Sequence, residues 1–582
     1  MKNPTPANPT MTDNLLFEHF ATLAAAPDGI VRLRELILQL AVQGKLGTQD
    51  AGDEPAGKLI ERIRTEKERL ITEGEIRPDK KVDSIEPSEI PFVLPECWLW
   101  VRLGSVLIKL QDGVHNSPDN FENGDFMYVT AKNIKPDGIQ LSNITYISAK
   151  DHEDSYKRCD PKFGDVLLIK DGATSGIATI NNLHEPFSML SSVALLRPPE
   201  EILNKYLLYV LRSPFFYTYL REDMSGCAIT RVTLVKLNRF IIPLPPLAEQ
   251  HRIVAKVDRL MALCDELEAR QQQERAGCLR LGTASLAGLQ NATHPEEFGR
   301  QWAQVCDAFD LILDCPENVA VLRQTILQLA VQGRLVRQEP GDEPAKKLVE
   351  RIRKEKERLL KEGTIKNDGK YESIHSDEIP FTIPTVWQWI RLGEITQKIG
   401  SGSTPRGGKS VYLTTGIPFL RSQNVWNDGL WLNNVAFISP EIHSQMSATH
   451  VQPRDILLNI TGASIGRSAI VPDNFKEGNV SQHVSIVRMV DETFRNYLHY
   501  CIISPYFQNK IMDVQVGMSR EGLSKKVLRD LLIPLPPLAE QHRIVAKVDT
   551  LMSLCDSLES RLKERAGVQA RFAMAVGRQV AG

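Results

Sequence analysis

The chain has 582 residues, too long for one hydrophobic core, and its length suggests about three to five structural units. Its apolar fraction of 42% and charged fraction of 24% are those of an ordinary globular protein. The net charge of -2 excludes a chain that is basic overall, although a local basic patch would be enough to bind phosphates.

The cysteines and the apolar runs exclude several further classes of protein. None of the nine cysteines forms a C-x-x-C pair, so the sequence predicts no zinc or other metal site. Their odd number and scattered positions are typical of reduced thiols in a cytoplasmic protein. No apolar run approaches the length of about 18 residues that a membrane span needs, and the N-terminus lacks the apolar core of a signal peptide.

The chain contains one long unit twice. The stretch ILQLAVQGKL at Ile37 returns as ILQLAVQGRL at Ile326, 289 positions later. The stretch IPLPPLAEQHRIVAKVD begins at Ile242 and again, letter for letter, at Ile533. Such self-similarity predicts a tandem repeat, in which each copy supplies one set of structural elements.

Two diverged segments lie between these near-identical stretches, at about residues 98–240 and 387–532. Faint landmarks still align, such as YVTAKNIKPDG at Tyr128 with FLRSQNVWNDG at Phe419. We refer to the two segments as insert 1 and insert 2, and to the near-identical rest as the frame. The comparison predicts that the frame does one job twice, whereas the inserts do different versions of a second job.

The frame reads as helical. In GDEPAGKL, Asp53 or Glu54 can cap a helix that has Pro55 in its first turn. After Pro246 comes a helix, expected over residues 253–277, whose apolar positions alternate in steps of four and three. Such a seam predicts a coiled coil, and its positions in the two copies are Ile253, Val257, Leu260, Cys264, Leu267, Ile544, Val548, Leu551, Cys555, Leu558 and Leu562. One such seam alone could equally pack against its own core, but two equal seams favour pairing with each other.

The inserts mix strands with helices. GDVLLIK, SSVALLRP, RDILLNI and HVSIVRM are typical of buried strands, whereas KYLLYVLRSPFFYTYL and NYLHYCIISPYFQNKI are typical of helices. Asp165 and Asp455 are expected to open strands, and Gly172 and Gly462 to adopt positive φ in turns. Each insert is therefore predicted to be an α+β domain.

The long repeated motifs, ILQLAVQGKL, DEPA followed by LIERIRTEKERL, and IPLPPLAEQHRIVAKVD, resemble the specificity subunits of type I restriction-modification systems. The order of the motifs matches over nearly the whole chain, and the length resembles the subgroup with longer conserved regions. The resemblance implies an α+β tandem repeat, with two target-recognition domains separated by two long conserved helices that form an antiparallel coiled coil. It divides the chain into a conserved helical region (1–97), recognition domain 1 (98–242), a central conserved region (243–386), recognition domain 2 (387–533) and a conserved coiled-coil helix (534–582).

The resemblance also implies partners. Each recognition domain would read one half of a bipartite, asymmetric site on double-stranded DNA. The chain would assemble with two modification subunits and two restriction subunits. S-adenosylmethionine, ATP and Mg²⁺ would be bound by those subunits, and this chain would carry no cofactor and no catalytic residue.

Several motifs that suggest catalysis are weak. STPRGGKS at Ser403 lacks the first glycine of a phosphate-binding loop, and no apolar strand is expected before it. Asp137, Asp160 and Lys162 could suggest a nuclease site, but insert 2 has no matching set. His251 and His542, in the repeated helices, are expected to pack or cap rather than to catalyse.

Neither insert is strongly basic, so DNA contacts are expected to concentrate in loops on a rigid scaffold. Arginine suits guanine edges, asparagine and glutamine suit adenine edges, and lysine suits phosphates. The candidates are Lys132, Asn133, Lys170, Thr174, Ser175, Thr404, Arg406, Lys409, Arg421, Gln423, Asn424, Ser464, Arg467 and Arg520. The alternative for each is a solvated loop residue. The alternative for the whole chain is a helical scaffold whose inserts bind protein partners.

Overall fold

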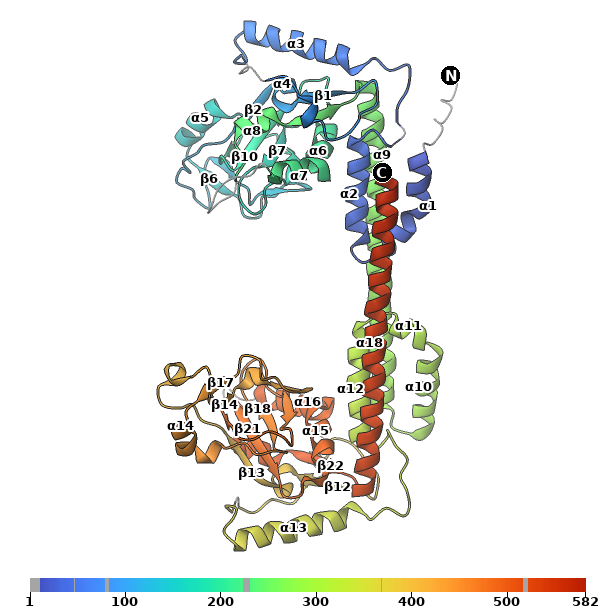
Figure 1. Cartoon of the computed structure of the whole chain (residues 1–582), viewed down its shortest axis with the longest axis vertical. Coiled ribbons are helices and arrows are strands. Elements are labelled where there is room, and N and C mark those ends of the chain that lie inside the picture. The colour runs from blue at the N-terminus through green and yellow to red at the C-terminus, as the bar shows by residue number, and fades with distance from the viewer. Residues whose placement is uncertain are drawn as a thin grey trace. The chain divides into compact units, whose positions relative to one another are not determined.

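The structure is a computed structural model, which describes residues 11–46, 48–78, 83–222, 231–367, 369–516 and 522–581 (Figure 1). It divides into two compact units. Unit 1 consists of Met1–Gln273 and Glu564–Gly582, and unit 2 consists of Glu274–Lys563. Each unit therefore contains one insert together with a part of each of the two longest helices.

Unit 1 begins with frame helices and then contains insert 1. Its helices are α1 (Met11–Ala25), α2 (Gly29–Val42), α3 (Ala56–Thr72), α4 (Leu103–Val106), α5 (Ala149–Arg158), α6 (Asn204–Arg212), α7 (Pro214–Glu222), α8 (Leu234–Arg239) and the first part of α9 (Leu247–Asn291). Its strands are β1 (Leu99–Arg102), β2 (Lys109–Asp112), β3 (Phe126–Val129), β4 (Ile134–Lys135), β5 (Gly138–Ile139), β6 (Thr145–Ile147), β7 (Val166–Ile169), β8 (Ala178–Ile180), β9 (Ser188–Met189), β10 (Val193–Arg197) and β11 (Ile241–Leu244).

Unit 2 repeats this order. Its helices are α10 (Pro295–Asp307), α11 (Phe309–Leu313), α12 (Glu317–Val331), α13 (Ala345–Lys361), α14 (Pro440–Gln445), α15 (Arg495–Ile503), α16 (Pro505–Val516), α17 (Lys525–Asp530) and the first part of α18 (Leu538–Ala581). Its strands are β12 (Gln388–Arg391), β13 (Thr396–Ser401), β14 (Ile417–Leu420), β15 (Val425–Trp426), β16 (Gly429–Leu430), β17 (Ala436–Ile438), β18 (Ile456–Asn459), β19 (Ser468–Ile470), β20 (Asn479–Val480), β21 (Val484–Met489) and β22 (Leu532–Leu535). None of the helices that the structure describes is long and apolar enough to cross a membrane.

The two inserts have the same sheet topology, which confirms the predicted α+β tandem repeat. Insert 1 has a four-stranded sheet in the order β2-β10-β7-β8 and a three-stranded sheet in the order β6-β3-β9. Insert 2 has the equivalent orders β13-β21-β18-β19 and β17-β14-β20. The four strands predicted from their apolar runs are β7, β10, β18 and β21, whose residues are almost all buried.

The frame closes each insert with a short antiparallel pair of strands. β1 pairs with β11, and β12 pairs with β22. The Tyr206 hydroxyl in α6 donates a hydrogen bond to the Pro243 carbonyl (2.8 Å), and Tyr497 in α15 donates in the same way to Pro534 (2.5 Å). The closing strands therefore lie near the predicted ends of the inserts.

Proline divides the two apolar stretches predicted to be helical. Each becomes two helices, α6 and α7 in insert 1 and α15 and α16 in insert 2, which break at Ser213–Pro214 and Ser504–Pro505. The residue before a proline is driven towards extended conformations, so each helix ends there.

The two longest helices exceed the expected span of 253–277, and the cap predicted before α3 is wrong. α9 has 45 residues and α18 has 44. Pro55 itself is the N-cap of α3, without a side-chain cap bond. Asp53 pairs instead with Arg252 of α9, and Glu54 pairs with Arg62 (2.5 Å), so neither carboxylate is available to cap.

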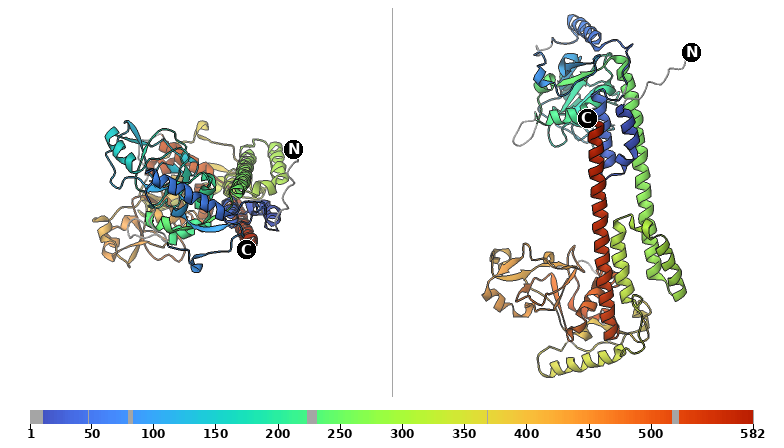
Figure 2. Two further views of the ribbon diagram at one scale, coloured as in Figure 1. Left: turned by 90° about the horizontal axis from the view of Figure 1, so that it is seen from above. Right: turned by 45° about the vertical axis from the view of Figure 1, so that its right-hand side comes forward.

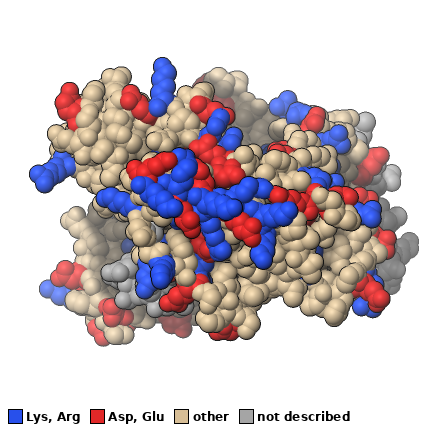
Figure 3. Space-filling view, turned by 90° about the horizontal axis from the view of Figure 1, so that it is seen from below, with Lys and Arg blue, Asp and Glu red and all other residues tan. Residues whose placement is uncertain are grey.

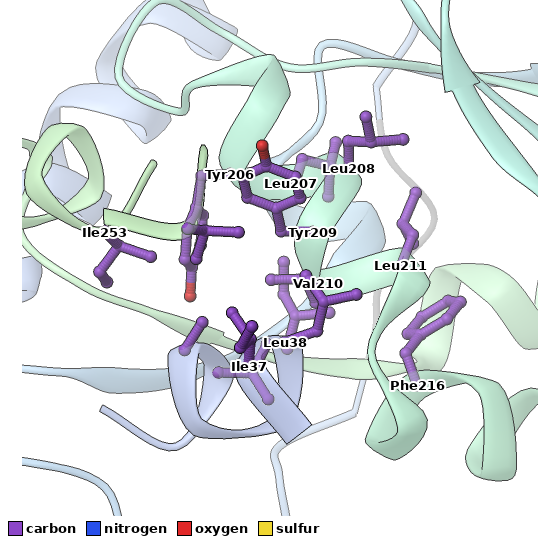
Figure 4. Close-up of a cluster of buried hydrophobic side chains, with 14 of the residues drawn as sticks. Ile37, Leu38, Tyr206, Leu207, Leu208, Tyr209, Val210, Leu211, Phe216 and Ile253 are labelled. Carbon is purple, nitrogen blue, oxygen red and sulfur yellow. The ribbon is translucent and has the colours of Figure 1, made fainter. Parts of the chain in front are cut away.

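The seam predicted on α9 is buried, but it does not pair with the seam on α18. Ile253, Val257, Leu260 and Cys264 are at most 1% exposed. They share one core with α2 and α6, from which Figure 4 shows Ile37 and Tyr206 together with Ile253. The last turns of α18 join the same core. Leu267 packs at its edge, half-buried.

The seam on α18 lies in a different core, in unit 2. Ile544, Val548 and Cys555 are buried against α12 and α15. The remaining seam positions pack against the same core, half-buried, and are Leu551, Leu558 and Leu562. Each seam is therefore covered by the repeated ILQLAVQG helix of its own unit, which corrects the expected pairing between the two seams.

Hydrogen bonds from α12 fix the direction of α9 in unit 2. Asn318, at the start of α12, donates to the Cys278 carbonyl of α9 (3.2 Å). Gln332, just past the end of α12, donates to the Gln290 carbonyl (3.2 Å). The two helices therefore run in the same direction, side by side with α10 (Figure 2).

α18 runs the opposite way along α12. Arg323 in α12 pairs with Asp556 of α18 (2.6 Å), whereas Gln338, beyond the end of α12, donates to Glu540 at the start of α18 (3.1 Å). Because α12 runs with α9 and against α18, the two long helices are antiparallel within this unit, as the fold class predicts.

One buried carboxylate connects each insert to its long helix. Glu249, in the first turn of α9, is 0% exposed and accepts hydrogen bonds from the Trp98 indole N–H (2.7 Å), Thr48 (3.0 Å) and Gln49 (3.0 Å). Glu540 of α18 is equally buried and accepts from the Trp387 indole (2.9 Å). Burial raises the pKa of both carboxyls, and the donated hydrogen bonds oppose that rise.

The raised pKa values predict how stability depends on pH. A carboxyl whose pKa is higher in the folded state binds its proton more tightly there, so the free energy of unfolding falls as pH rises from about 4.5 through the raised values. The double substitution Glu249→Gln with Glu540→Gln retains an acceptor for each indole and should flatten this part of the profile. Denaturant unfolding between pH 5 and 7.5, followed by tryptophan fluorescence, measures the slope. Glu61→Gln with Glu350→Gln, at exposed positions, is the control, and an unchanged slope in the first variant would contradict the prediction.

Candidate nucleic-acid interface

Four loops meet at one end of insert 2. The loop after β13 meets the one after β20 through Ser403 N–H and the Val480 carbonyl (3.2 Å). Asn459, at the end of β18, donates to the Ser422 carbonyl (2.9 Å) in the loop after β14. Ile460 N–H, at the end of β18, donates to the His483 carbonyl (3.0 Å) and connects the two pairs, so the candidate residues in the loops after β13, β14 and β18 lie along one edge of the domain.

Insert 1 gathers the equivalent loops in the same way. Ser191 N–H donates to the Val114 carbonyl (2.9 Å), and Lys170 N–H donates to the Ser192 carbonyl (2.9 Å). The two inserts therefore present the same loop scaffold with different side chains.

Asn133 and Asn424 hold these loops from the inside. The Asn133 amide oxygen accepts from Thr130 N–H (3.0 Å), and its nitrogen donates to the Gln140 carbonyl (3.2 Å). Asn424 makes the equivalent bonds, from Arg421 N–H (3.0 Å) and to the Trp431 carbonyl (2.8 Å). Asn133 is 3% and Asn424 0% exposed, so both amides fix a turn and neither is placed to read a base.

Lys170 and Ser175 of insert 1 are also buried. The Lys170 ammonium lies 3.4 Å from both Asp112 and Asp171, and Asp112 pairs in addition with Arg158 (2.8 Å). The Ser175 hydroxyl donates to the Gly172 carbonyl (2.6 Å). These candidates therefore stabilise the loop scaffold of insert 1.

The turn residues have the roles predicted for them. Asp165 accepts from Lys162 N–H (2.7 Å), and Asp455 accepts from Gln452 N–H (2.7 Å), where each opens its strand. Gly172 and Gly462 have φ of +87° and +77°, in the left-handed region that favours glycine.

The other candidates lie at or near the surface of the loops. Lys132, Thr174, Arg406, Lys409 and Gln423 are exposed. Thr404 is exposed and donates to Gln482 (3.1 Å), and Ser464 is half-buried beside Asn459 (3.2 Å). Contact of these residues with DNA stays a prediction, and Arg520 lies outside the described residues.

Arg421 and Arg467 are half-buried and carry charge that no carboxylate neutralises. Among the residues that the structure describes, neither forms an ion pair. Arg421 donates to the Asn434 carbonyl (3.2 Å) and lies over the Tyr412 ring (5.7 Å). Arg467 lies over the indole of Trp426 (3.8 Å). Such guanidinium groups can donate to guanine edges or phosphates.

The sequence prediction did not identify two features of insert 2, a pair of stacked tryptophans and the histidine that anchors their hairpin. The β15–β16 hairpin carries Trp426 and Trp431, whose rings stack with centroids 4.5 Å apart. His499 of α15 anchors the hairpin through the Asn427 carbonyl (3.2 Å), and burial lowers the pKa of this histidine to about 4. The spacing of the two tryptophans about a turn was the signal, but it does not reveal which surface the rings occupy.

The structure differs from the sequence prediction at two of the weak motifs. The strand β13 does lead into STPRGGKS, but a short 3-10 helix follows at Gly408–Val411 where a phosphate-binding loop needs an α-helix. His251 and His542 are exposed, so neither packs as expected.

Asp160, the central residue of the nuclease-like set of insert 1, is engaged in ion pairs. The Asp160 carboxylate pairs with Lys109 and Arg197, and only distantly with Lys162 (4.0 Å). Among the described residues, no group of three or more His, Cys, Asp and Glu side chains is placed to hold a metal ion. The arrangement offers donors and charge for recognition.

Comparison with known proteins agrees with this arrangement. The family model described as type I restriction modification DNA specificity domain matches twice, at residues 95–275 and 384–566. The Escherichia coli type I restriction enzyme EcoAI specificity subunit is 32% identical over 94% of this chain and 93% of its own. The EcoEI specificity subunit of the same organism is 30% identical, with the same coverage.

Among solved structures, the HsdS subunit from Thermoanaerobacter tengcongensis is 21% identical, with a TM-score of 0.41, over 85% of this chain and 98% of that one. The family match covers both repeats, and the similarity to the curated relatives runs through almost the whole chain. The protein therefore belongs to the family of type I restriction-modification specificity subunits.

Proposed function

We propose that this chain reads a bipartite, asymmetric site on double-stranded DNA, with one half read by each insert, as the DNA specificity subunit of a type I restriction-modification complex. The observation that carries the proposal is the pair of inserts, which share one scaffold but differ in the side chains of the four loops at its edge. A rigid scaffold with variable loops is the usual arrangement of a recognition surface.

Repeated features of the frame support the proposed partner subunits. α3 and α13 are exposed helices. Every charged residue of α3 recurs in α13, as Lys58 does in Lys347, and α13 carries three further lysines, Lys346, Lys354 and Lys361. Ion pairs repeat as well, since Arg69 pairs with Glu66 (2.7 Å) and Arg358 with Glu355 (2.6 Å). Figure 3, seen from the side of α13, shows basic and acidic residues interleaved.

Packing explains why the buried residues of these helices are the same, but it does not require identical exposed charges. The frame also contains an internal control, because α1 has diverged from its counterpart in unit 2, which is formed by the end of α10 and by α11. The repeated charges support one binding surface for a modification subunit in each half, hence two such subunits. Two restriction subunits would join this assembly.

The cofactors of the reaction belong, in this proposal, to those partners. S-adenosylmethionine would be bound by the modification subunits, and ATP and Mg²⁺ by the restriction subunits. The location would be the cytoplasm, which suits the eight cysteines that the structure describes, all of them free thiols.

An exchange of insert 1 tests the two-reader proposal. Residues 103–240 would be replaced by the equivalent segment of a relative, which keeps Trp98, the β1–β11 pair and the Pro243 acceptor. Mapping methylated adenines after assembly with the modification subunits should show one half-site changed and the other unchanged. A change in both half-sites would contradict the proposal, and assembly without any DNA binding by the parent chain would favour the alternative of protein-binding inserts.

Two adjacent residues of one loop test which side chain stabilises the loop and which contacts DNA. Asn424→Ala leaves buried donors and acceptors without partners, which costs about 1–3 kcal/mol, and should lower both the unfolding midpoint and DNA affinity. Gln423→Ala, at an exposed position, should keep the midpoint and weaken discrimination in the second half-site only. Thermal unfolding and binding to a series of single-base variants measure both effects. Equal loss of stability in the two variants would contradict these assignments.

Charge reversal on α3 and α13 tests the stoichiometry. Lys58→Glu and Lys347→Glu place an acidic group on an exposed, repeated surface and should each weaken one docking site about tenfold through like-charge repulsion. Native mass spectrometry at limiting modification subunit should then find mostly one bound copy for each single variant and fewer for the double variant. Lys150→Glu, an exposed lysine of insert 1 outside the frame, is the matched control. Two bound copies in every variant would show that the subunits dock elsewhere.

A further inference from the structure

The β15–β16 hairpin of insert 2 carries a three-layer stack. The indoles of Trp426 and Trp431 stack with their planes 21° apart, and the Arg467 guanidinium lies 3.8 Å from the centre of the Trp426 ring. One face of a ring cannot hold both neighbours at such distances. Trp426 is therefore the middle layer, between Arg467 and Trp431.

The stack is held in place by the polar groups of its own hairpin. The Trp426 indole N–H donates to the Gln423 carbonyl (2.8 Å), and the Trp431 indole N–H donates to the Asp428 carboxylate (3.2 Å). Asn427, at the tip, accepts at its side-chain oxygen from Ser468 N–H (3.1 Å). Since both indole N–H groups are already bonded, the outer surface of Trp431 is purely aromatic.

That outer surface is open. Trp431 is 48% exposed, and the neighbouring Leu432 is 47% exposed, so the hairpin presents two large apolar side chains together. Single exposed apolar residues are common, but an aromatic ring that is braced from behind and open in front is arranged for contact.

The fold of the domain does not require the stack. The β4–β5 hairpin of insert 1 forms with the same pairing, yet it has Lys135 and Gln140 where insert 2 has the two tryptophans. Ile177 stands in insert 1 where Arg467 stands in insert 2. The three side chains are therefore an addition to insert 2, in the part of the chain where the two copies differ.

The surroundings of the stack are suited to a polyanion. Arg467 and Arg421 both lack a carboxylate partner among the described residues, and Lys409 and Arg406 lie exposed in the loop that follows β13. A flat aromatic group flanked by unneutralised guanidinium groups matches a stacked base beside a phosphate.

We propose that Trp431 is an aromatic wedge that stacks on a base pair of the second half-site, braced by Trp426 and Arg467, with Arg421 beside the flanking phosphates. The proposal rests on the reading of DNA by insert 2. The brace reduces the side-chain entropy that contact would otherwise cost. A wedge is accommodated most easily at flexible pyrimidine–purine steps, so the second half-site should contain one at the position of contact.

Trp431→Gln is the most direct variant, because glutamine occupies this position in the β4–β5 hairpin, which folds with it. The complex of the full chain with its modification subunits would be titrated with duplexes that carry 2-aminopurine at successive positions of the second half-site. The parent should raise the fluorescence at one step through local unstacking. Trp431→Gln should abolish that signal and weaken specific binding about tenfold, while Trp431→Phe retains most of both.

Ile379→Ala, at an isoleucine of the frame that is 40% exposed and lies outside the four loops, is the control for loss of apolar surface and should bind like the parent. Discrimination in the first half-site should be unchanged in every variant.

If Trp431→Gln binds and unstacks DNA like the parent, the wedge is wrong and DNA reading by insert 2 stands. If the parent complex shows no sequence preference in the second half-site, the proposed function fails first. Loss of modification-subunit binding in Trp431→Gln, with DNA binding by the remaining complex unaltered, would assign the ring to a protein contact and overturn the wedge.

Discussion

A carboxylate buried at the first turn of each long helix is the constraint on which each half of the molecule depends. Glu249 receives the indole N–H of Trp98, the first residue of insert 1, and the side chains of the loop that follows α2. A carboxylate removed from water is costly unless donors surround it, so the helix, the loop and the insert must come together at one point. Glu540 imposes the same requirement on the second half. The repeated stretches are nearly identical because this arrangement tolerates few alternatives.

The residues that hold each insert to the frame are different from those of the recognition surface. Tyr206 and Tyr497 bond to the closing strands, and Arg102 and Arg391 pair with Glu89 (2.7 Å) and Glu378 (3.0 Å) at the entrance of each insert. The four loops at the far edge of the insert sheets take no part in these bonds. Side chains in the loops can therefore change without loss of the packing that holds an insert to its helix.

The sequence predicts the elements better than it predicts their neighbours. The apolar period finds the buried face of α9 at Ile253 and Val257, but it does not say that α2 joins the core on that face, because the ILQLAVQG helix and a second long helix are equally apolar partners. The strands β7 and β18 are predictable, since four consecutive buried residues need an apolar run. The burial of Asn133 and Asn424, by contrast, could not be predicted from the sequence. A polar residue in a loop is expected to face water, and only the backbone around it shows that its amide is bonded from within.

The two inserts differ in whether their basic side chains pair with carboxylates. In insert 1, Asp112 pairs with both Lys170, which is buried, and Arg158, which stays exposed on α5. In insert 2, Arg421 and Arg467 lie against aromatic rings, which weaken the hydration of a guanidinium without neutralising its charge. In the proposed contact with DNA, a phosphate near insert 2 would meet these two guanidinium groups, whereas insert 1 would present exposed side chains such as Lys132. Affinity from phosphates is independent of sequence, so in the proposed function the unneutralised charge of insert 2 would raise affinity for the duplex more than it would select bases.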